Sequence, residues 1–516
     1  MTKCEPAIRN PRSAVVWLAF AATTLCVYFL GLTMPLVGPD EPRYAQVARE
    51  MFERGDWITP TLGGFNWFEK PALLYWLQIA SYNVFGVSEF AARFGSALFG
   101  LGTIASLWLL GRNIERYATN NHQRSTNDFA NWLALIGAST VGIVAFAHGA
   151  SFDIILTFPI TAALISYFLY DLRRRTGYLL GFYFFIGVAL LAKGLVGILF
   201  PFAIVLLYHL LAWKRPAWSF VGSLFWGTLL AAAVASTWYL PMYMRHGYEF
   251  IDQFFVQHHF QRYTSNKYLH PQPFYFFFWV LPLMTIPWMP FFIASVWSAS
   301  KRIISGDEAG SATGNDSAEP VVDAIVPRSL LLFALAWLTV PLVFFSFSGS
   351  KLPGYILPAV PAAIILTTYQ VYGVIQGTLM RSYIVQAVAA GTFAVVLIAV
   401  VAFAPGFAET DSVKGFFAEA NGRGLGELPV LMLHGTSHNA EFYASGRIVR
   451  QADGRPKRLS GPPEVLGEIR QRDGRPVLVL VPLEYLQQLL DGDSLTAEVI
   501  KSNGEWVLVR VEQSQF

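Results

Sequence analysis

The chain has 516 residues, of which 54% are hydrophobic, 15% aromatic and only 14% charged. A soluble globular protein carries roughly 25% charged residues, so this chain has too little charge to cover the surface of a large water-soluble protein. The same composition excludes a disordered chain, a collagen and a coiled coil, and its 2 cysteines cannot build a disulfide scaffold. The remaining class is a polytopic α-helical membrane protein, in which the placement of charge is more informative than the net charge of +3.

Apolar segments long enough to cross a bilayer recur along the chain as far as residue 404. A membrane-spanning helix needs roughly 20 mostly apolar residues. Segments of this kind predict about eleven spans (eleven to thirteen), near residues 14–36, 91–111, 130–148, 153–171, 177–192, 195–213, 218–240, 274–298, 329–347, 355–373 and 383–404. A shorter apolar segment, 72–85, is predicted to be a helix lying at the outer membrane interface.

The basic residues predict the orientation of these spans. The first span follows a basic tail, is too long for a signal-peptide core and lacks a small-residue cleavage site, so it is predicted to be a retained signal anchor. With the N-terminus in the cytoplasm, the runs Arg173–Arg175 and Lys214-Arg215 fall in inner loops, as the positive-inside rule requires. This topology places loops 37–90 and 241–273 outside, in the periplasm if the cell is Gram-negative.

The composition changes after the last predicted span. We therefore predict a transmembrane domain over residues 1–404 and a small soluble α/β domain over 405–516, which also lies outside. The predicted strands and helix of this second domain are Val430–Leu433, Val477–Val481, Ala497–Lys501 and Trp506–Val511 around an Asn503-Gly504 turn, with a helix at Pro463–Arg470.

Charged residues are costly in a membrane, so those that remain at the span ends indicate function. Asp40 and Glu41 follow the first span directly. One carboxylate could act as a base toward an acceptor while a cation holds the other, and Arg43 could neutralise either of them. The alternative is a solvated loop or a cap for a helix at Pro42–Glu53.

Three lysines are predicted to lie at the same outer depth, namely Lys70, Lys193 and Lys351. Together they could cradle a phosphate, or each could extend singly toward lipid head groups. In the second outer loop, His258-His259 could share a divalent cation with a carboxylate, although their spacing matches no diagnostic metal pattern. No combination of basic and aromatic residues indicates nucleic acid binding.

Several stretches are similar to a known family. They are DEPRYAQVAREMFERGDWITPTLGGFNWFEKP, FAARFGSALFG, AKGLVGILFP, HHFQRY and KLPGYILP, in this order along the chain. They resemble the aminoarabinose–lipid A transferases, which belong to the protein-mannosyltransferase-like GT-C glycosyltransferases and take sugars from polyprenyl phosphates. The C-terminal segment carries no motif that matches.

The resemblance implies a role for particular residues. Asp40 and Asp153 correspond to acidic residues near the reaction centre. Glu69 and His259 correspond to a pair that holds a divalent metal ion, zinc or a similar ion. The implied contacts to the donor phosphate are Lys70, Lys193, Arg43, Tyr44, Tyr355, Arg262 and Lys351.

These observations together predict an integral-membrane glycosyltransferase of the bacterial inner membrane. It would transfer aminoarabinose or a related sugar from undecaprenyl phosphate to lipid A, or to another acceptor at the periplasmic face, in one inverting step. An alternative is an O-glycosyltransferase that acts on protein or glycan hydroxyls. A flippase or transporter is disfavoured, because the span centres lack paired ionisable residues and no repeats are evident.

Overall fold

The computed structural model describes residues 11–120, 128–261, 272–304, 326–376, 378–437, 439–491 and 494–514. The chain forms two compact units. The first comprises Met1–Leu30, Ser96–His148 and Phe152–Leu397, and the second comprises Gly31–Gly95, Gly149–Ser151 and Ile398–Phe516. The second unit therefore joins the first predicted outer loop to the C-terminal segment. The predicted domain boundary at residue 404 stays a prediction.

Long apolar helices dominate the described part of the chain, and six are long and apolar enough to cross a membrane. These are α4 (Glu89–Asn120), α7 (Phe152–Arg173), α10 (Trp218–Ile251), α14 (Arg328–Ser346), the 3-10 helix η2 with α15 (Pro353–Ala359 and Val360–Ile375) and α16 (Leu379–Ile398). Two bent pairs pass the same criteria together, α5 with α6 (Phe129–Ala138 and Val141–Ala147) and α12 with α13 (Phe276–Met284 and Met289–Ile304). Shorter apolar helices are α1 (Pro11–Phe29), α8 (Gly177–Lys193) and α9 (Val196–Leu211).

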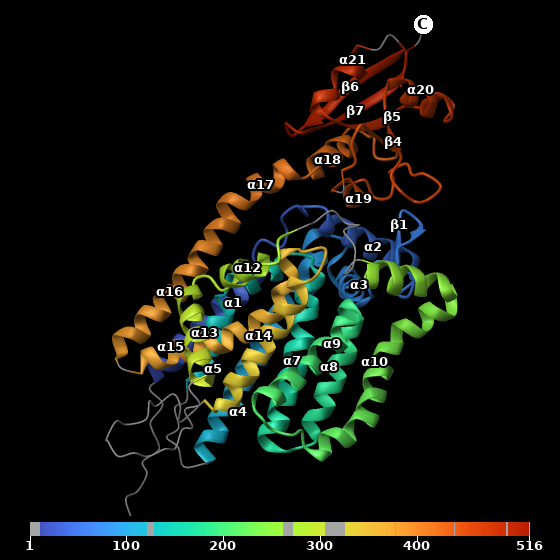
Figure 1. Ribbon diagram of the computed structural model, residues 1–516. Coiled ribbons are helices and arrows are strands. Elements are labelled where there is room, and N and C mark those ends of the chain that lie inside the picture. Colours follow the sequence, from blue (N-terminus) through green and yellow to red (C-terminus); the bar gives the residue numbers. More distant parts are fainter. Residues whose placement is uncertain are drawn as a thin grey trace, which may run out of the picture. The chain divides into compact units, whose positions relative to one another are not determined.

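Each predicted span coincides with one of these helices or bent pairs, so the predicted helical membrane fold is confirmed. How many of the helices cross the membrane stays a prediction. Within the first unit, α8 packs against α7, α9 and α10, and Figure 1 shows α7, α8 and α9 side by side. A side chain at Gly197 would lie 2.5 Å from the backbone of Ala189, so glycine permits the close approach of α9 to α8.

The second unit contains the first predicted outer loop, which is largely ordered into helices. Helix α2 (Asp40–Arg54) has two acidic residues in its first turn, where the helix dipole favours negative charge. It ends at Gly55, whose φ of 66° is the left-handed conformation common after helices. A short hairpin, β1 (Thr61–Leu62) and β2 (Phe65–Asn66), leads to α3 (Leu73–Phe85). The helix predicted over 72–85 is thus confirmed, whereas its position at the membrane interface stays a prediction.

The C-terminal segment of the same unit is built around a five-stranded sheet of order β4-β3-β5-β7-β6. Strands β4, β3 and β5 are parallel, and β7 runs antiparallel to both β5 and β6. The strands are β3 (Val430–Leu433), β4 (Arg458–Leu459), β5 (Val477–Pro482), β6 (Leu495–Ser502) and β7 (Trp506–Gln513). The helices are α17 (Ala404–Asp411), α18 (Lys414–Gly422), α19 (Asn439–Tyr443), α20 (Pro462–Arg470) and α21 (Gln487–Leu490). The predicted strands and helix are confirmed, but β4 was not predicted because two residues are too few to show an alternating pattern.

Helices cover both faces of this sheet (Figure 1). On β5, Leu478 and Leu480 face the apolar side chains of α18 and α19. The alternate residues Val477, Val479 and Val481 pack with α20 and α21. Alternation along a strand sends successive side chains to opposite faces, so this strand, buried on both sides, reads as a continuous apolar run. The result is a three-layer α/β/α arrangement.

Candidate functional site

In the first unit, the structure brings Lys193 and Asp153 together. Lys193 is the last residue of α8, and Asp153 is the second residue of α7. Because these helices pack side by side, the ammonium group of Lys193 forms an ion pair with Oδ1 of Asp153. Both side chains are partly buried. A predicted phosphate ligand and a predicted acidic residue of the reaction centre are therefore direct neighbours.

The KLPGY stretch completes this cluster from the 3-10 helix η2, which packs against α7. The Nζ atom of Lys193 lies 4.7 Å from the centroid of the Tyr355 ring, within the range of a cation–π interaction. A Cβ atom at Gly354 would lie 1.9 Å from Oδ2 of Asp153. Glycine at this position thus leaves the space that the Asp153 carboxylate occupies.

Lys351, which precedes this 3-10 helix, is held by backbone carbonyl groups. Its ammonium group donates hydrogen bonds to the carbonyl oxygens of Ser348 at 2.6 Å and Gln272 at 3.0 Å. The residue is only 7% exposed, and this burial lowers the pKa of its ammonium group. Two of its three protons are thus engaged by backbone carbonyl groups, and its role as a phosphate ligand stays a prediction.

In the second unit, Asp40 lies at the start of α2 and faces solvent. Its side chain is 52% exposed, and Nη2 of Arg43 donates to its Oδ1 at 2.8 Å. The guanidinium carbon of Arg43 lies 5.6 Å from the centroid of the Trp67 ring. Of the two adjacent carboxylates, Arg43 therefore pairs with the exposed one.

Three further predicted site residues gather around this helix start. Glu69 and Lys70 form an ion pair of 3.2 Å with each other. Tyr44 is buried, and its pKa is raised well above the ordinary value by this burial and then by the negative charges of Asp40 and Glu69. The Tyr44 hydroxyl therefore stays protonated over the physiological pH range, so that it remains a hydrogen-bond donor beside these two carboxylates.

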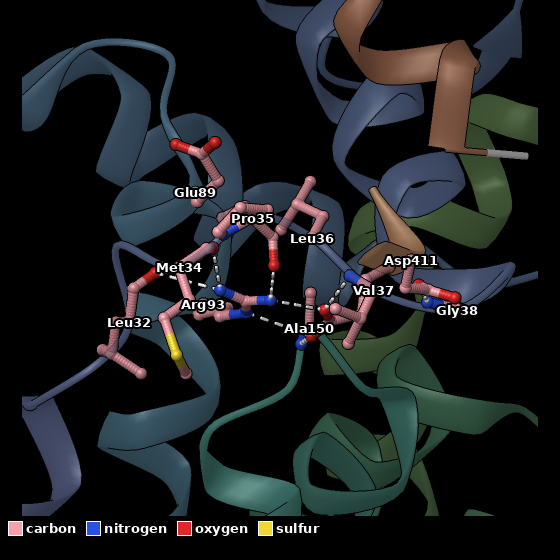
Figure 2. Close-up of polar contacts among 12 residues, drawn as sticks. Leu32, Met34, Pro35, Leu36, Val37, Gly38, Glu89, Arg93, Ala150 and Asp411 are labelled. Carbon is pink, nitrogen blue, oxygen red and sulfur yellow. Dashed lines mark hydrogen bonds and ion pairs between the residues drawn. The ribbon is translucent and has the colours of Figure 1, made fainter. Parts of the chain in front are cut away.

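The neighbouring carboxylate, Glu41, is bound by an arginine that the sequence analysis did not single out. Arg93, labelled in Figure 2, lies in the first turns of α4 and is 3% exposed. It donates from Nη2 to Oε2 of Glu41 at 2.6 Å. A second bond runs from its Nε to Oε1 at 3.2 Å. The prediction that a cation holds one of the two carboxylates thus matches Glu41, with Arg93 as the cation.

The remaining donors and acceptors of this pair bind the backbone of two other segments, the stretch between α1 and α2 and the residue Ala150. Arg93 donates to the carbonyl oxygens of Leu32, Met34 and Pro35, which follow α1. Glu41 accepts from the backbone N–H groups of Val37 at 3.1 Å and Ala150 at 2.6 Å. A usable signal did exist in the sequence, because Arg93 is an ionisable residue at the third position of the span predicted over 91–111, where such residues are costly.

The predicted metal pair lies only partly within the described part of the chain. His259 falls in the π-helix η1 (Asp252–Gln261), but its side chain and the whole of Arg262 lie outside the described residues. Among the residues that the structure describes, no three His, Cys, Asp or Glu side chains gather as a metal site. Glu69 forms an ion pair with Lys70. The role of Glu69 and His259 as metal ligands stays a prediction.

Comparison with known proteins extends this description. The family model of the dolichyl-phosphate-mannose-protein mannosyltransferases matches residues 13–251. An undecaprenyl phosphate-α-4-amino-4-deoxy-L-arabinose arabinosyl transferase from Aeromonas salmonicida is 30% identical over 389 residues, covering 73% of this chain and 64% of the relative. The corresponding transferase from Serratia proteamaculans is 29% identical, covering 67% of this chain and 59% of the relative. Over most of its length the chain is thus similar in sequence to aminoarabinose transferases.

The fold of the chain is also similar to that of a solved transferase structure. The crystal structure of ArnT from Cupriavidus metallidurans bound to undecaprenyl phosphate matches with a TM-score of 0.74, at 23% identity, over 97% of this chain and 98% of that one. The predicted fold class, a GT-C membrane protein with a small C-terminal α/β domain, is thereby confirmed. The alignments with the two arabinosyl transferases span less than two thirds of their length.

Proposed function

We propose that the protein is an integral-membrane glycosyltransferase. It moves aminoarabinose or a related sugar from undecaprenyl phosphate to lipid A, or to another acceptor at the periplasmic face of the bacterial inner membrane. The observation that carries this proposal is the cluster of Lys193, Asp153 and Tyr355, in which three segments far apart in the sequence meet at one point. The names of the arabinosyl transferase relatives support the choice of donor.

The proposed chemistry places charge where lysines can stabilise it. The acceptor oxygen forms a bond to the anomeric carbon as the bond from that carbon to the donor phosphate oxygen breaks. The leaving group is undecaprenyl phosphate, which gains one negative charge as a phosphate monoester. Lys193 and Lys70 would stabilise this developing charge. Direct displacement inverts the configuration at the anomeric carbon.

The role of Asp40 depends on the acceptor. A lipid A phosphate is already ionised and needs little base catalysis, so Asp40 would align the acceptor. A hydroxyl group must lose its proton as it attacks, and the exposed carboxylate of Asp40 would then act as the general base. The match to the protein mannosyltransferase model over residues 13–251 favours this second candidate, an O-glycosyltransferase acting on hydroxyls.

The metal ion remains part of the proposal. Glu69 and His259 would hold a divalent cation, zinc or a similar ion, for which one carboxylate and one imidazole are suitable ligands. When bound, such an ion would add positive charge near the leaving phosphate. The predicted roles of Arg43, Tyr44, Tyr355, Arg262 and Lys351 as donor-phosphate contacts are likewise proposals.

A reconstituted transfer assay tests the function. Purified protein in lipid nanodiscs is supplied with undecaprenyl-phospho-aminoarabinose and with lipid A or a hydroxyl acceptor. The masses of the products are measured by mass spectrometry. Wild-type protein should modify lipid A, and Asp40→Asn should keep measurable transfer to this acceptor. The second candidate would be established if the protein transferred sugar to the hydroxyl acceptor alone. In that case Asp40→Asn should lower the rate by about 10²–10⁴-fold, and a higher pH should partly restore it. No transfer to either acceptor would contradict both.

A further inference from the structure

Three successive backbone N–H groups between α1 and α2 each donate to a side chain. Leu36 donates to the hydroxyl of Tyr443 at 2.7 Å, and Gly38 donates to Oδ2 of Asp411 at 2.9 Å. Between them, Val37 donates to Glu41. Two of these three acceptors come from the C-terminal segment, and they bind the stretch Leu36–Gly38 that precedes α2 and its first residue Asp40. Figure 2 shows Asp411 beside Gly38.

The same C-terminal residues also engage the start of α4. The Tyr443 hydroxyl, which accepts from Leu36, donates to Oε1 of Glu89 at 3.2 Å. Lys414 forms an ion pair of 2.7 Å with the same oxygen of Glu89. Glu89 lies one helical turn before Arg93 in α4. The contacts from the C-terminal segment and the Glu41–Arg93 pair therefore bind adjacent turns of the same helix. We call Asp411, Lys414 and Tyr443 the clasp.

The acceptors of the clasp are themselves held in place. Asn439 donates from its side-chain amide to the backbone oxygen of Asp411 at 3.0 Å. Tyr443 is the last residue of α19, and this helix packs against α2. Arg49 on α2 adds a hydrogen bond of 2.9 Å to the Ser445 hydroxyl. Because several contacts join these elements, removing one group of the clasp should loosen the turn locally without separating the C-terminal domain from α2.

We propose that the C-terminal domain is a positioning module, whose clasp fixes the turn Leu36–Gly38 and thereby the placement of Asp40. This inference rests on the proposed function, since Asp40 matters only if sugar transfer takes place. It gives a role to a part of the chain that lies beyond the family match at residues 13–251. Tyr443 and Asp411 act through the backbone and are positioning residues, not catalytic residues.

Two substitutions remove the acceptors with little change in shape, Tyr443→Phe and Asp411→Asn. Tyr443→Phe leaves the Leu36 N–H without its partner, and we expect kcat to fall about 10-fold, which corresponds to ~1.4 kcal/mol, with KM unchanged. Hydrogen exchange should accelerate at Leu36 in this variant and at Gly38 in Asp411→Asn. Matched controls are Tyr485→Phe and Asp453→Asn in the same domain, which should leave both measurements unchanged.

The ion pair offers a rescue test. Lys414→Glu and Glu89→Lys place like charges together, and each alone should lower kcat, whereas the double variant restores the pairing and should recover most of it. Normal kcat in Tyr443→Phe and Asp411→Asn, despite faster exchange at Leu36 and Gly38, would overturn the positioning role. Unchanged exchange in both variants would overturn the clasp itself, even if the wild-type protein transfers no sugar and the proposed function fails separately.

Discussion

Glu41 forms an ion pair of 2.6 Å with the buried Arg93, while the adjacent Asp40 faces solvent beside Arg43. Two neighbouring carboxylates of one motif therefore have different surroundings. Glu41 is 12% exposed and binds backbone N–H groups as well as the guanidinium group. The Asp40 side chain is 52% exposed. The two acidic residues thus divide into one that is held by the surrounding chain and one that is accessible.

This difference predicts that substitutions at Arg93 and at Asp40 change the free energy of unfolding by different amounts. Arg93→Ala leaves the largely covered Glu41 carboxylate without its partner; for a buried pair this typically costs about 3–5 kcal/mol. Asp40→Asn alters an exposed pair worth about 0.2–1 kcal/mol, so it should leave stability almost unchanged. Denaturant unfolding of the purified variants in detergent measures both. Equal stability of Arg93→Ala and the wild-type protein would show that the pair does not hold this region together.

Gly354 supplies the second prediction. A Cβ atom in Gly354→Ala would force the Asp153 carboxylate away, because the distance to Oδ2 would be only 1.9 Å. We expect a loss of stability of about 1–3 kcal/mol and a large loss of transfer, as the Asp153–Lys193 pair is broken. Gly391→Ala is the matched control in α16, since an added Cβ there meets no atom within 4 Å. Normal transfer by Gly354→Ala would remove Asp153 from the proposed reaction centre.

Chelation tests the proposed metal ion. If Glu69 and His259 hold a divalent cation that assists the leaving phosphate, a strong chelator should slow transfer by at least about 100-fold. Added zinc should restore the rate in the wild-type protein but not in Glu69→Gln or His259→Ala. Elemental analysis of the purified protein checks the bound metal directly. A metal-free preparation with full activity in the presence of chelator would dispose of the metal proposal.

The predicted topology is open to a fusion experiment. With the N-terminus inside and the basic loops in the cytoplasm, the C-terminal domain and its clasp must lie outside the membrane. Alkaline phosphatase fused at Gln515 should be active, and green fluorescent protein fused at the same residue should be dark. A fluorescent fusion with inactive phosphatase would reverse the topology and place the proposed site residues on the wrong side.

Elements with a clear pattern of apolar residues could be predicted from the sequence. Apolar runs of span length gave the membrane helices, and alternating or continuous apolar runs gave β3, β5, β6 and β7, because burial dictates both patterns. Strand β4 and helix α19 are too short to show any period. Their places are set by the sheet and by packing on α2, which are tertiary effects.

The site was predictable in its residue types but not in its pairings. The family resemblance singled out Asp153, and the predicted outer depth singled out Lys193. Only the packing of α7 on α8 shows that the two residues form an ion pair. The partners Glu41 and Arg93 are 52 residues apart, so no local spacing relates them. Likewise, nothing in the C-terminal segment marks Tyr443 as an acceptor for Leu36, because that bond depends on the docked structure.

The central claim is that Lys193 stabilises the phosphate that leaves when a lipid-linked sugar is transferred. Its most direct test is mass spectrometry of lipid A from a deletion strain that carries the wild-type gene, Lys193→Ala or the control Lys301→Ala. We predict aminoarabinose-modified lipid A with the wild-type and control proteins, and a loss of about 30- to 1000-fold with Lys193→Ala at equal expression. Wild-type levels of modified lipid A in the Lys193→Ala strain would contradict this account.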